Sequence, residues 1–299
     1  MPDESALKEQ ASGTAMDTAF MRALAACDPR KEIAGGDQLA EIFLDDERRK
    51  PLKDPAIRAW IMRNKLTPGA YEFMIVRTAY MDEVVKKALN ENIGQIVFLG
   101  AGYDSRPYRF RSLIQDTVLF ELDTRLTQER KKACLQRAQV EVPDRVRFVP
   151  VNFEAADLQA RLAEAGYCPA KSGLFIWEGV SYYLTPEAVN SMLRFVSSCS
   201  SPGSSICFDF ASLSPQALTE EGATKLRQLM KSQHADEPTR FGIRAGELET
   251  YLRDRGYEVM ECLGAADMND RYLGGGRYPE LGKVPSMFCI VLAKVIGTT

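Results

Sequence analysis

The stretch IVFLGAGYDSRPYRF, residues 96–110, decides the fold of this chain. Its apolar run ends at Leu99, and the glycine-rich turn 100–102 that follows lets a ligand approach the backbone closely. The next apolar run ends about 20 residues later at Asp123, whose carboxylate can accept hydrogen bonds from ribose hydroxyls. This spacing predicts a nucleoside site at the carboxyl ends of two strands of an α/β sheet.

Short apolar runs alternate with amphipathic stretches through the central region, which is the pattern of parallel strands joined by helices. Five runs predict buried strands, at residues 94–100, 117–123, 145–151, 172–179 and 204–211. Helical spacing lies between them, near residues 125–138, 155–165 and 185–198. We therefore expect an α/β fold with a doubly wound, mostly parallel sheet. Two further strands late in the chain would complete a sheet of seven strands.

The first 90 residues predict a helical cap. A helix is expected over 37–44, then a charged, solvated connection over 45–55, and a long helix after Pro68-Gly69. One stripe of that long helix is apolar, comprising Phe73, Val76, Tyr80, Val84 and Ala88. Arg77 lies on the same stripe, where a charge requires a partner or a ligand.

We expect one domain over residues 1–299. Its four segments are a helical cap (1–90), a cofactor-binding core (91–212), a lid insertion (213–255) and a final strand pair (256–299). The lid is predicted to be helical and charged. The runs at 256–264 and 286–295 predict the last two strands, and the long loop between them contains three consecutive glycines, a candidate hinge.

The composition excludes several classes of protein. Hydrophobic residues make up 45% and charged residues 26% of the 299, and the net charge is −3, so nucleic acid and membrane partners are not expected. No apolar run approaches the ~20 residues that span a bilayer, and the polar, acidic start of the chain predicts a cytoplasmic protein. Seven scattered cysteines and one histidine leave little for disulfides, metal sites or a Ser-His-Asp triad.

The choice of nucleoside follows from a missing glycine. A dinucleotide site of the GxGxxG type needs its third glycine for close helix packing beneath a pyrophosphate. Here Ser105-Arg106-Pro107 occupies that region. S-adenosylmethionine carries a ribose but no phosphate, so the departure favours it over NAD.

Several ordered motifs resemble those of the leucine carboxyl methyltransferase family, which includes phosphatase carboxyl methyltransferases and bacterial O-methyltransferases of polyketide pathways. LGAGYDSRPYRF is similar to its LGAGLDTRAYRL-type motif, and FELDTRLTQERK to its second motif. FIWEGVSYYLTPEAV resembles its EGVLMYL-type motif at the fourth strand. The pair Arg77 and Asp82 also fits the family. The resemblance is good over roughly residues 65–200 and implies a Rossmann-like methyltransferase fold.

The resemblance also implies roles for particular residues. Arg77 would bind the methionyl carboxylate of S-adenosyl-L-methionine through charge-assisted hydrogen bonds. Gly100 and Gly102 would line the methionine and ribose region, and Asp123 would hold the ribose hydroxyls. Glu178 would lie near the amino acid portion of the cofactor.

At the adenine, the family usually has an aspartate where this chain has Asn152, whose carbonyl can still accept from the adenine amine. Phe153 would contact the base. Asp104 and Arg106 would brace the loop.

The acceptor determines whether a catalytic base is needed. A carboxylate is already ionised at neutral pH, whereas a phenol with a pKa of about 10 benefits from a base. Candidate bases are Glu178, Asp209 and His234. Aromatic side chains that could line an acceptor pocket are Trp177, Tyr182, Tyr183, Tyr272 and Tyr278.

The favoured interpretation is an S-adenosyl-L-methionine-dependent O-methyltransferase acting on a carboxylate or phenolic oxygen of a small natural product, in secondary metabolite biosynthesis. A protein C-terminal carboxyl methyltransferase of the phosphatase type is the main alternative. An NAD-dependent oxidoreductase and a non-catalytic cofactor-binding protein are the others. The sequence leaves the acceptor and the oligomeric state open.

Overall fold

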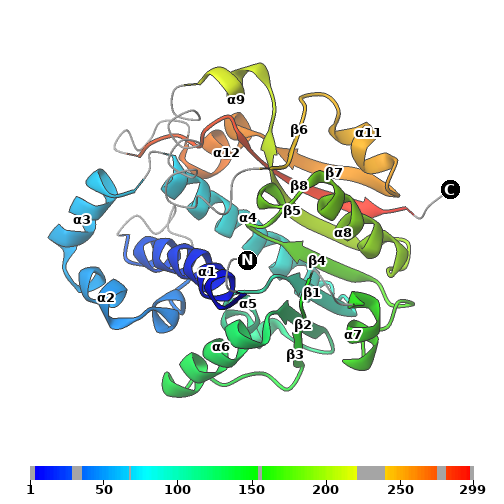
Figure 1. The fold of residues 1–299 in the computed structure, drawn as a ribbon, viewed down its shortest axis with the longest axis horizontal. Helices are drawn as coiled ribbons and strands as arrows, with labels where there is room; N and C mark the ends of the chain where they lie inside the picture. Colours follow the sequence, from blue (N-terminus) through cyan, green and yellow to red (C-terminus); the bar gives the residue numbers. More distant parts are fainter. Residues whose placement is uncertain are drawn as a thin grey trace.

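The computed structural model describes residues 4–28, 36–66, 69–153, 157–220, 240–274 and 281–296, with side chains from Ala15 onward. Their strands form one sheet in the order β3-β2-β1-β4-β5-β8-β7, and a short β6 pairs with β5 (Figure 1). The strands are β1 (Gln95–Leu99), β2 (Val118–Asp123), β3 (Val146–Pro150), β4 (Gly173–Trp177), β5 (Ser205–Ser212), β6 (Gly242–Ile243), β7 (Tyr257–Leu263) and β8 (Phe288–Val295).

Neighbouring strands from β3 to β5 pair in parallel, whereas β8 runs antiparallel between β5 and β7. The order turns back at β1, where β2 lies on one side and β4 on the other. The expected doubly wound, mostly parallel sheet is therefore confirmed. Ligands of such sheets bind beyond the carboxyl ends of the strands at this reversal.

Helices cover both faces of the sheet (Figure 1). The described helices are α1 (Glu4–Ala26), α2 (Asp46–Arg49), α3 (Pro55–Asn64), α4 (Ala70–Asn90), α5 (Arg106–Arg109), α6 (Arg125–Arg137), α7 (Leu158–Glu164), α8 (Pro186–Ser198), α9 (Pro215–Thr219), α11 (Leu248–Arg253) and α12 (Ala265–Tyr272). Single 3-10 turns are η1 (Ala40–Phe43), η2 (Lys50–Lys53), η3 (Arg111–Leu113) and η4 (Ser181–Tyr183).

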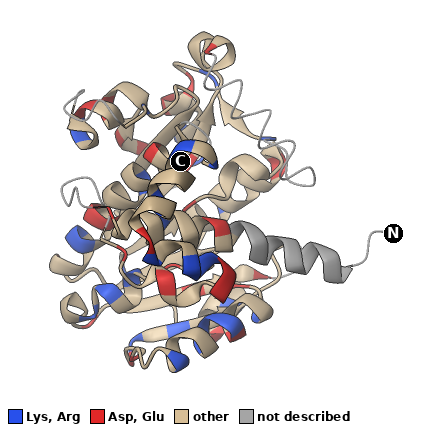
Figure 2. Ribbon diagram, turned by 90° about the vertical axis from the view of Figure 1, so that its left-hand side faces the viewer, with Lys and Arg blue, Asp and Glu red and all other residues tan. Residues whose placement is uncertain are grey.

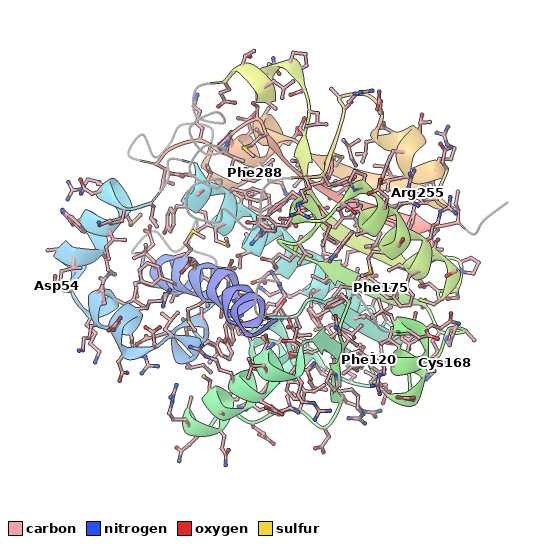
Figure 3. All side chains as sticks on the ribbon, viewed as in Figure 1. Asp54, Phe120, Cys168, Phe175, Arg255 and Phe288 are labelled. Carbon is pink, nitrogen blue, oxygen red and sulfur yellow. The ribbon has the colours of Figure 1, made fainter. Side chains whose placement is uncertain are left out.

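Alternate residues of each strand supply two separate cores. Ile96 and Phe98 of β1 pack on one face with α1, α4, α6 and α12. Val97 and Leu99 pack on the other face with α7, α8 and α11. Both faces of the central strands β1, β4 and β5 are thus closed to water, whereas the edge strands β3 and β7 keep exposed residues. Burial on both faces explains why the central strands read as mostly apolar runs. Figure 3 shows how densely side chains fill these layers, for example around Phe120 and Phe175.

The long helix α4 differs from its expected single stripe, because it is buried on nearly all sides along its first half. Residues 71–78 are all buried, although only Phe73, Val76 and Arg77 of them belong to the predicted stripe. Helix α1 and strands β4 and β5 all contact it. A helix enclosed in this way presents Arg77 to the interior of the protein rather than to a surface.

Three expectations for the ends of the chain need correction. Residues 45–55, expected as a solvated connection, hold α2, η2 and the start of α3, because Asp45 and Asp54 cap helix N-termini with their side chains. The helix expected over 37–44 is the single turn η1. The loop before β8 contains α12. At the start of this helix the backbone N–H of Gly264 donates to Oδ2 of Asp267.

The lid expected over 213–255 is only partly helical in its described residues. It contains α9 and α11, but also β6, which extends the sheet beside β5. Residues 221–239 lie outside the described part of the chain. Acidic and basic residues are interspersed over the molecule (Figure 2). Within the part of the chain that the structure describes, no helix has the length and apolar character to cross a membrane.

Candidate active site

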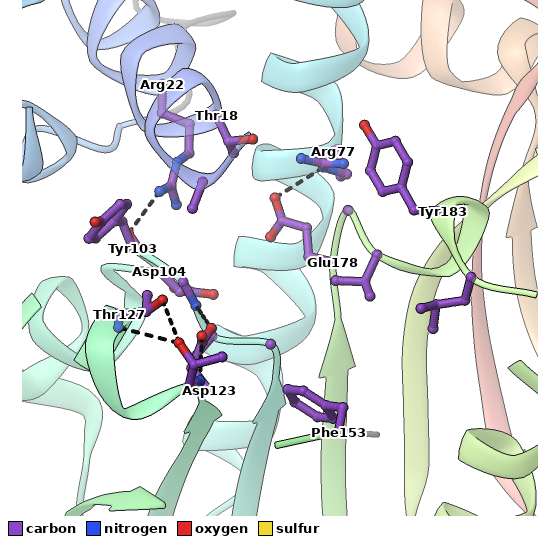
Figure 4. A pocket seen from close by; sticks show the side chains of 18 residues that line it. Thr18, Arg22, Arg77, Tyr103, Asp104, Asp123, Thr127, Phe153, Glu178 and Tyr183 are labelled. Atoms are coloured by element: carbon purple, nitrogen blue, oxygen red, sulfur yellow. Dashed lines mark hydrogen bonds and ion pairs between the residues drawn. The ribbon is translucent and has the colours of Figure 1, made fainter. Parts of the chain in front are cut away.

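A cavity of about 300 Å³ opens beyond the carboxyl ends of β1, β2 and β4, where the strand order reverses (Figure 4). It is lined by Ala15, Thr18, Arg22, Arg77, Gly100, Ala101, Gly102, Tyr103, Asp104, Asp123, Thr124, Thr127, Phe153, Glu178, Gly179, Val180, Tyr183 and Leu184. The structure therefore brings Arg77, the glycine turn, Asp123, Phe153 and Glu178 to one cavity, although they are far apart in the sequence.

The turn after β1 and the end of β2 hold each other in place. Gly100 and Gly102 both have positive φ angles, 70° and 45°, which favour glycine. The backbone N–H of Gly102 donates to Oδ2 of Asp123 at 2.6 Å, and the N–H of Thr124 donates to Oδ1 at 2.7 Å. Burial raises the pKa of Asp123, while these N–H groups oppose that rise. The carboxylate thus lies on the cavity wall with a fixed orientation.

Glu178 follows β4 and lies between two arginines. Its Oε1 is 3.0 Å from Nε of Arg77, and its Oε2 is 2.7 Å from Nη1 of Arg106. Burial acts to raise the pKa of Glu178, but the two guanidinium groups outweigh it and hold the pKa at about 2. Glu178 is therefore an ionised carboxylate at the cavity, and its low pKa makes it a poor proton acceptor.

Arg77 lines the cavity, and its guanidinium is already hydrogen-bonded within the protein. Its Nη1 donates to Oδ2 of Asp209 at 2.7 Å and to the hydroxyl of Tyr182 at 3.1 Å. Its Nη2 donates to Sδ of Met74, a weak acceptor, at 3.4 Å. That second nitrogen is the part of Arg77 with the most capacity left for a ligand.

Asp209 does not reach the cavity wall. Its side chain is fully buried in β5, where Oδ1 accepts from the backbone N–H of Gly179 at 2.7 Å and Oδ2 accepts from Arg77. The geometry therefore makes Asp209 a partner of Arg77, not a group in contact with an acceptor. The third candidate base, His234, lies outside the described residues.

Arg22 of α1 is a cavity residue that the sequence reading missed. It is 4% exposed; its Nη2 donates to the carbonyl of Tyr103 at 2.8 Å, and its Nη1 lies 3.3 Å from Asp37. Its buried Nε has no hydrogen-bond partner among the described residues. The available signal was a basic residue at helical spacing beside Ala19 and Ala23, the same kind of signal that identified Arg77.

The remaining candidates divide between the cavity and other places. Asp104 lines the cavity and accepts from Nη1 of Arg106 at 2.6 Å, so these two residues do bond across the loop. Asn152 is exposed and is not among the lining residues. Of the aromatic residues, Tyr183 lines the cavity, whereas Trp177, Tyr182 and Tyr272 do not, and Tyr278 lies outside the described residues.

Comparison with known proteins identifies the family to which this chain belongs. Residues 15–197 match the leucine carboxyl methyltransferase family, a span that includes every described cavity residue. The chain belongs to this family. YktD of Bacillus subtilis (strain 168), named an S-adenosyl-L-methionine-dependent methyltransferase, is 31% identical over 218 residues, which cover 72% of this methyltransferase and 69% of YktD.

A relative from Mycobacterium avium (strain 104) with the same named activity is 30% identical over 227 residues, covering 70% of this chain and 69% of the relative. Among solved structures, one from Thermobifida fusca described as a methyltransferase has a TM-score of 0.59 at 13% identity. It covers 93% of this chain and 94% of that one. The family, the Rossmann-like fold and S-adenosyl-L-methionine as cofactor, all expected from the sequence, are thus confirmed.

Proposed function

We propose that this methyltransferase is an O-methyltransferase that acts on a carboxylate or phenolic oxygen of a small natural product. One observation carries the proposal: the same cavity has Arg22, Arg77 and Glu178 on one side and the glycine turn with Asp123 on the other. Figure 4 shows Arg22, Arg77, Glu178 and Asp123 arranged around the same space.

The two groups fit the two halves of S-adenosyl-L-methionine. Glu178 would hold the α-ammonium group, and Arg22 with Arg77 would hold the α-carboxylate. The buried Nε of Arg22 supports this placement, because a ligand carboxylate would satisfy a donor that otherwise lacks a partner among the described residues. Asp123 would accept from the ribose hydroxyls, and Phe153, 38% exposed, would contact the adenine.

The acceptor would occupy the apolar side of the cavity. Val180, Tyr183 and Leu184 line it directly after Glu178, and Tyr183 lies beside Arg77 on the side away from Asp123 (Figure 4). Apolar and aromatic walls suit a small organic molecule better than a strongly hydrated one.

The chemistry asks little of the protein beyond alignment. When bound, the cofactor supplies a methyl group activated by its sulfonium. The cavity residues then have to orient the acceptor oxygen and exclude water. Because Glu178 has a pKa of about 2 and Asp209 lies behind Arg77, neither is suited to deprotonate a phenol. A carboxylate acceptor, which needs no base, is therefore favoured.

The experiment is methyl transfer from S-adenosyl-L-methionine by the purified chain to matched pairs of aromatic acids and phenols. Transfer to a carboxylate gives an ester that alkali cleaves, and transfer to a phenol gives an ether that resists it. We expect esters, and we expect His234→Ala to leave their rate unchanged. Transfer only to amines or thiols in a parallel panel would contradict the proposal.

A protein C-terminal carboxylate is the second candidate acceptor, and the family name supports it. It is tested in the same assay with a peptide that ends in leucine and with the same peptide as a C-terminal amide. Methylation of the acid peptide alone, with no transfer to small acids, would establish this alternative in place of the first.

A further inference from the structure

Nine buried charged side chains beside the cavity form one continuous network of ion pairs. Its members are Arg22, Arg77, Arg106 and Arg109 with Asp37, Asp82, Asp104, Glu178 and Asp209. Adjacent members lie 2.6 to 3.3 Å apart, and no side chain is more than 12% exposed. Several of these residues also line the cavity, as Figure 4 shows for Arg22, Arg77, Asp104 and Glu178.

Carboxylates outnumber guanidinium groups in this network. With every member ionised, four positive charges face five negative ones. Asp123, which accepts hydrogen bonds from the backbone N–H groups of Gly102 and Thr124 and has no cationic side chain paired with it among the described residues' ion pairs, adds a further negative charge on the cavity wall. A proton bound by one of these carboxylates would therefore still leave a negative excess.

Two other sets of charges near the network, among the described residues, leave this excess in place. Lys131 is 2.7 Å from Glu121, and both side chains are fully buried, so that pair is neutral by itself. Arg130 lies over the ring of Tyr103 but is exposed, so water screens its charge. Around the cavity the excess is buried, where Coulomb interactions are screened least.

We propose that this carboxylate excess makes the site select the cationic cofactor over its neutral product. S-adenosyl-L-methionine carries one more positive charge than S-adenosylhomocysteine, because methyl transfer breaks the carbon–sulfur bond and leaves its electron pair on sulfur. A unit charge about 10 Å from the excess, at an effective dielectric constant of about 20, corresponds to a preference of roughly tenfold. The inference rests on the proposed placement of the cofactor in this cavity.

Two consequences follow for the reaction. The preference stabilises the bound ground state, so it acts on cofactor affinity and product inhibition and does not raise kcat. A carboxylate acceptor would also be repelled less once the sulfonium is bound, which favours binding of the cofactor before the acceptor.

The test is calorimetric titration of the full chain at about pH 7 with three probes. These are S-adenosyl-L-methionine, S-adenosylhomocysteine and sinefungin, an analogue that carries an ammonium group in place of the sulfonium. We expect the first and third to bind about tenfold more tightly than S-adenosylhomocysteine. Asp209→Asn removes one buried negative charge. It is expected to reduce the ratio of the S-adenosylhomocysteine Kd to the S-adenosyl-L-methionine Kd.

Asp116→Asn is the matched control, because it removes the same charge from a side chain that is 79% exposed, and the ratio should not change. If S-adenosylhomocysteine binds wild type as tightly as S-adenosyl-L-methionine does, the inference is wrong while the cofactor site stands. If none of the probes binds folded protein, the placement of the cofactor is wrong instead. Should Asp209→Asn fail to fold, the comparison of the three probes on wild type still decides whether the site prefers the cationic ligand.

Discussion

Gly179 lies against the guanidinium of Arg77 in a backbone conformation that favours glycine. Its φ is 73°, and a Cβ atom there would be 3.1 Å from Nη1 and 3.3 Å from Nη2 of Arg77. Gly179→Ala should therefore displace Arg77 and weaken S-adenosylhomocysteine binding by about tenfold or more, besides costing roughly 1 kcal/mol of stability through backbone strain. Calorimetric titration and urea unfolding measure the two effects separately.

Gly203→Ala provides the control for strain alone. Gly203 also has a positive φ, 93°, but a Cβ there would meet nothing within 4 Å. We expect it to lose similar stability and to keep the affinity of wild type. Equal affinity losses in the two variants would show that contact with Arg77 is not what Gly179 provides.

Glu178 predicts a dependence of stability on pH. Its pKa is about 2 in the folded protein and 4.5 ordinarily, so its charged form stabilises the fold by on the order of 3 kcal/mol above pH 4.5. Because the folded pKa is depressed, this contribution is lost as the pH falls from 4.5 towards 2. Urea unfolding of wild type and Glu178→Gln should therefore differ most near neutral pH and converge in acid. A difference that stays constant with pH would contradict the low pKa.

At the scale of elements, a buried ion pair fastens α6 to β2. Nζ of Lys131 lies 2.7 Å from Oε2 of Glu121, and the hydroxyl of Tyr108 in α5 donates to Oε1 at 2.9 Å. Lys131→Met should lower the free energy of unfolding by about 3 to 5 kcal/mol, because it leaves the Glu121 carboxylate buried without its cation. Adding Glu121→Leu should recover part of that loss. Denaturant unfolding of the single and double variants measures both values.

Arg145→Met is the surface counterpart of that substitution. Arg145 pairs with Asp116 at 3.1 Å, but both side chains are largely exposed, so the loss should be below about 1 kcal/mol. If Lys131→Met costs no more than Arg145→Met, the buried pair does not hold α6 in place.

Residue patterns allowed the central elements to be predicted more accurately than those at the ends of the chain. The runs ending at Leu99 and Asp123 are strands that are covered on both faces of the sheet, so most of their residues are apolar. Residues 45–55 form short helices that begin at side-chain caps. Hydrophobic spacing does not reveal them, because their stability comes from the caps and not from an apolar stripe. The strand β6, with two residues, is too short to leave any pattern.

For the whole molecule, ligand binding should raise the temperature of unfolding. S-adenosylhomocysteine at about 100 times its Kd should raise the free energy of unfolding by roughly 2.7 kcal/mol. In a chain of this size that corresponds to a rise of a few degrees in Tm. NAD(H) at the same concentration should leave the unfolding temperature unchanged, because Ser105-Arg106-Pro107 occupies the place of the glycine that lets a helix pack beneath a pyrophosphate. Differential scanning fluorimetry makes the comparison, and a rise with NAD(H) alone would overturn the cofactor assignment at this site.

The sequence by itself determined the class of sheet and the glycine turn after β1, because these depend on local spacing. The family resemblance pointed to most of the residues that the structure brings to the cavity. A glycine turn after one strand and an acid after the next must meet wherever the two strands are parallel neighbours. Only the tertiary structure decided which charges share the cavity. Arg22 reaches it from the first helix, and Asp209 is shielded from it by Arg77, because packing between distant elements sets both positions. Helical spacing can mark a buried arginine such as Arg22 or Arg77, but it does not specify which carboxylates that arginine will meet, because its partners come from distant elements.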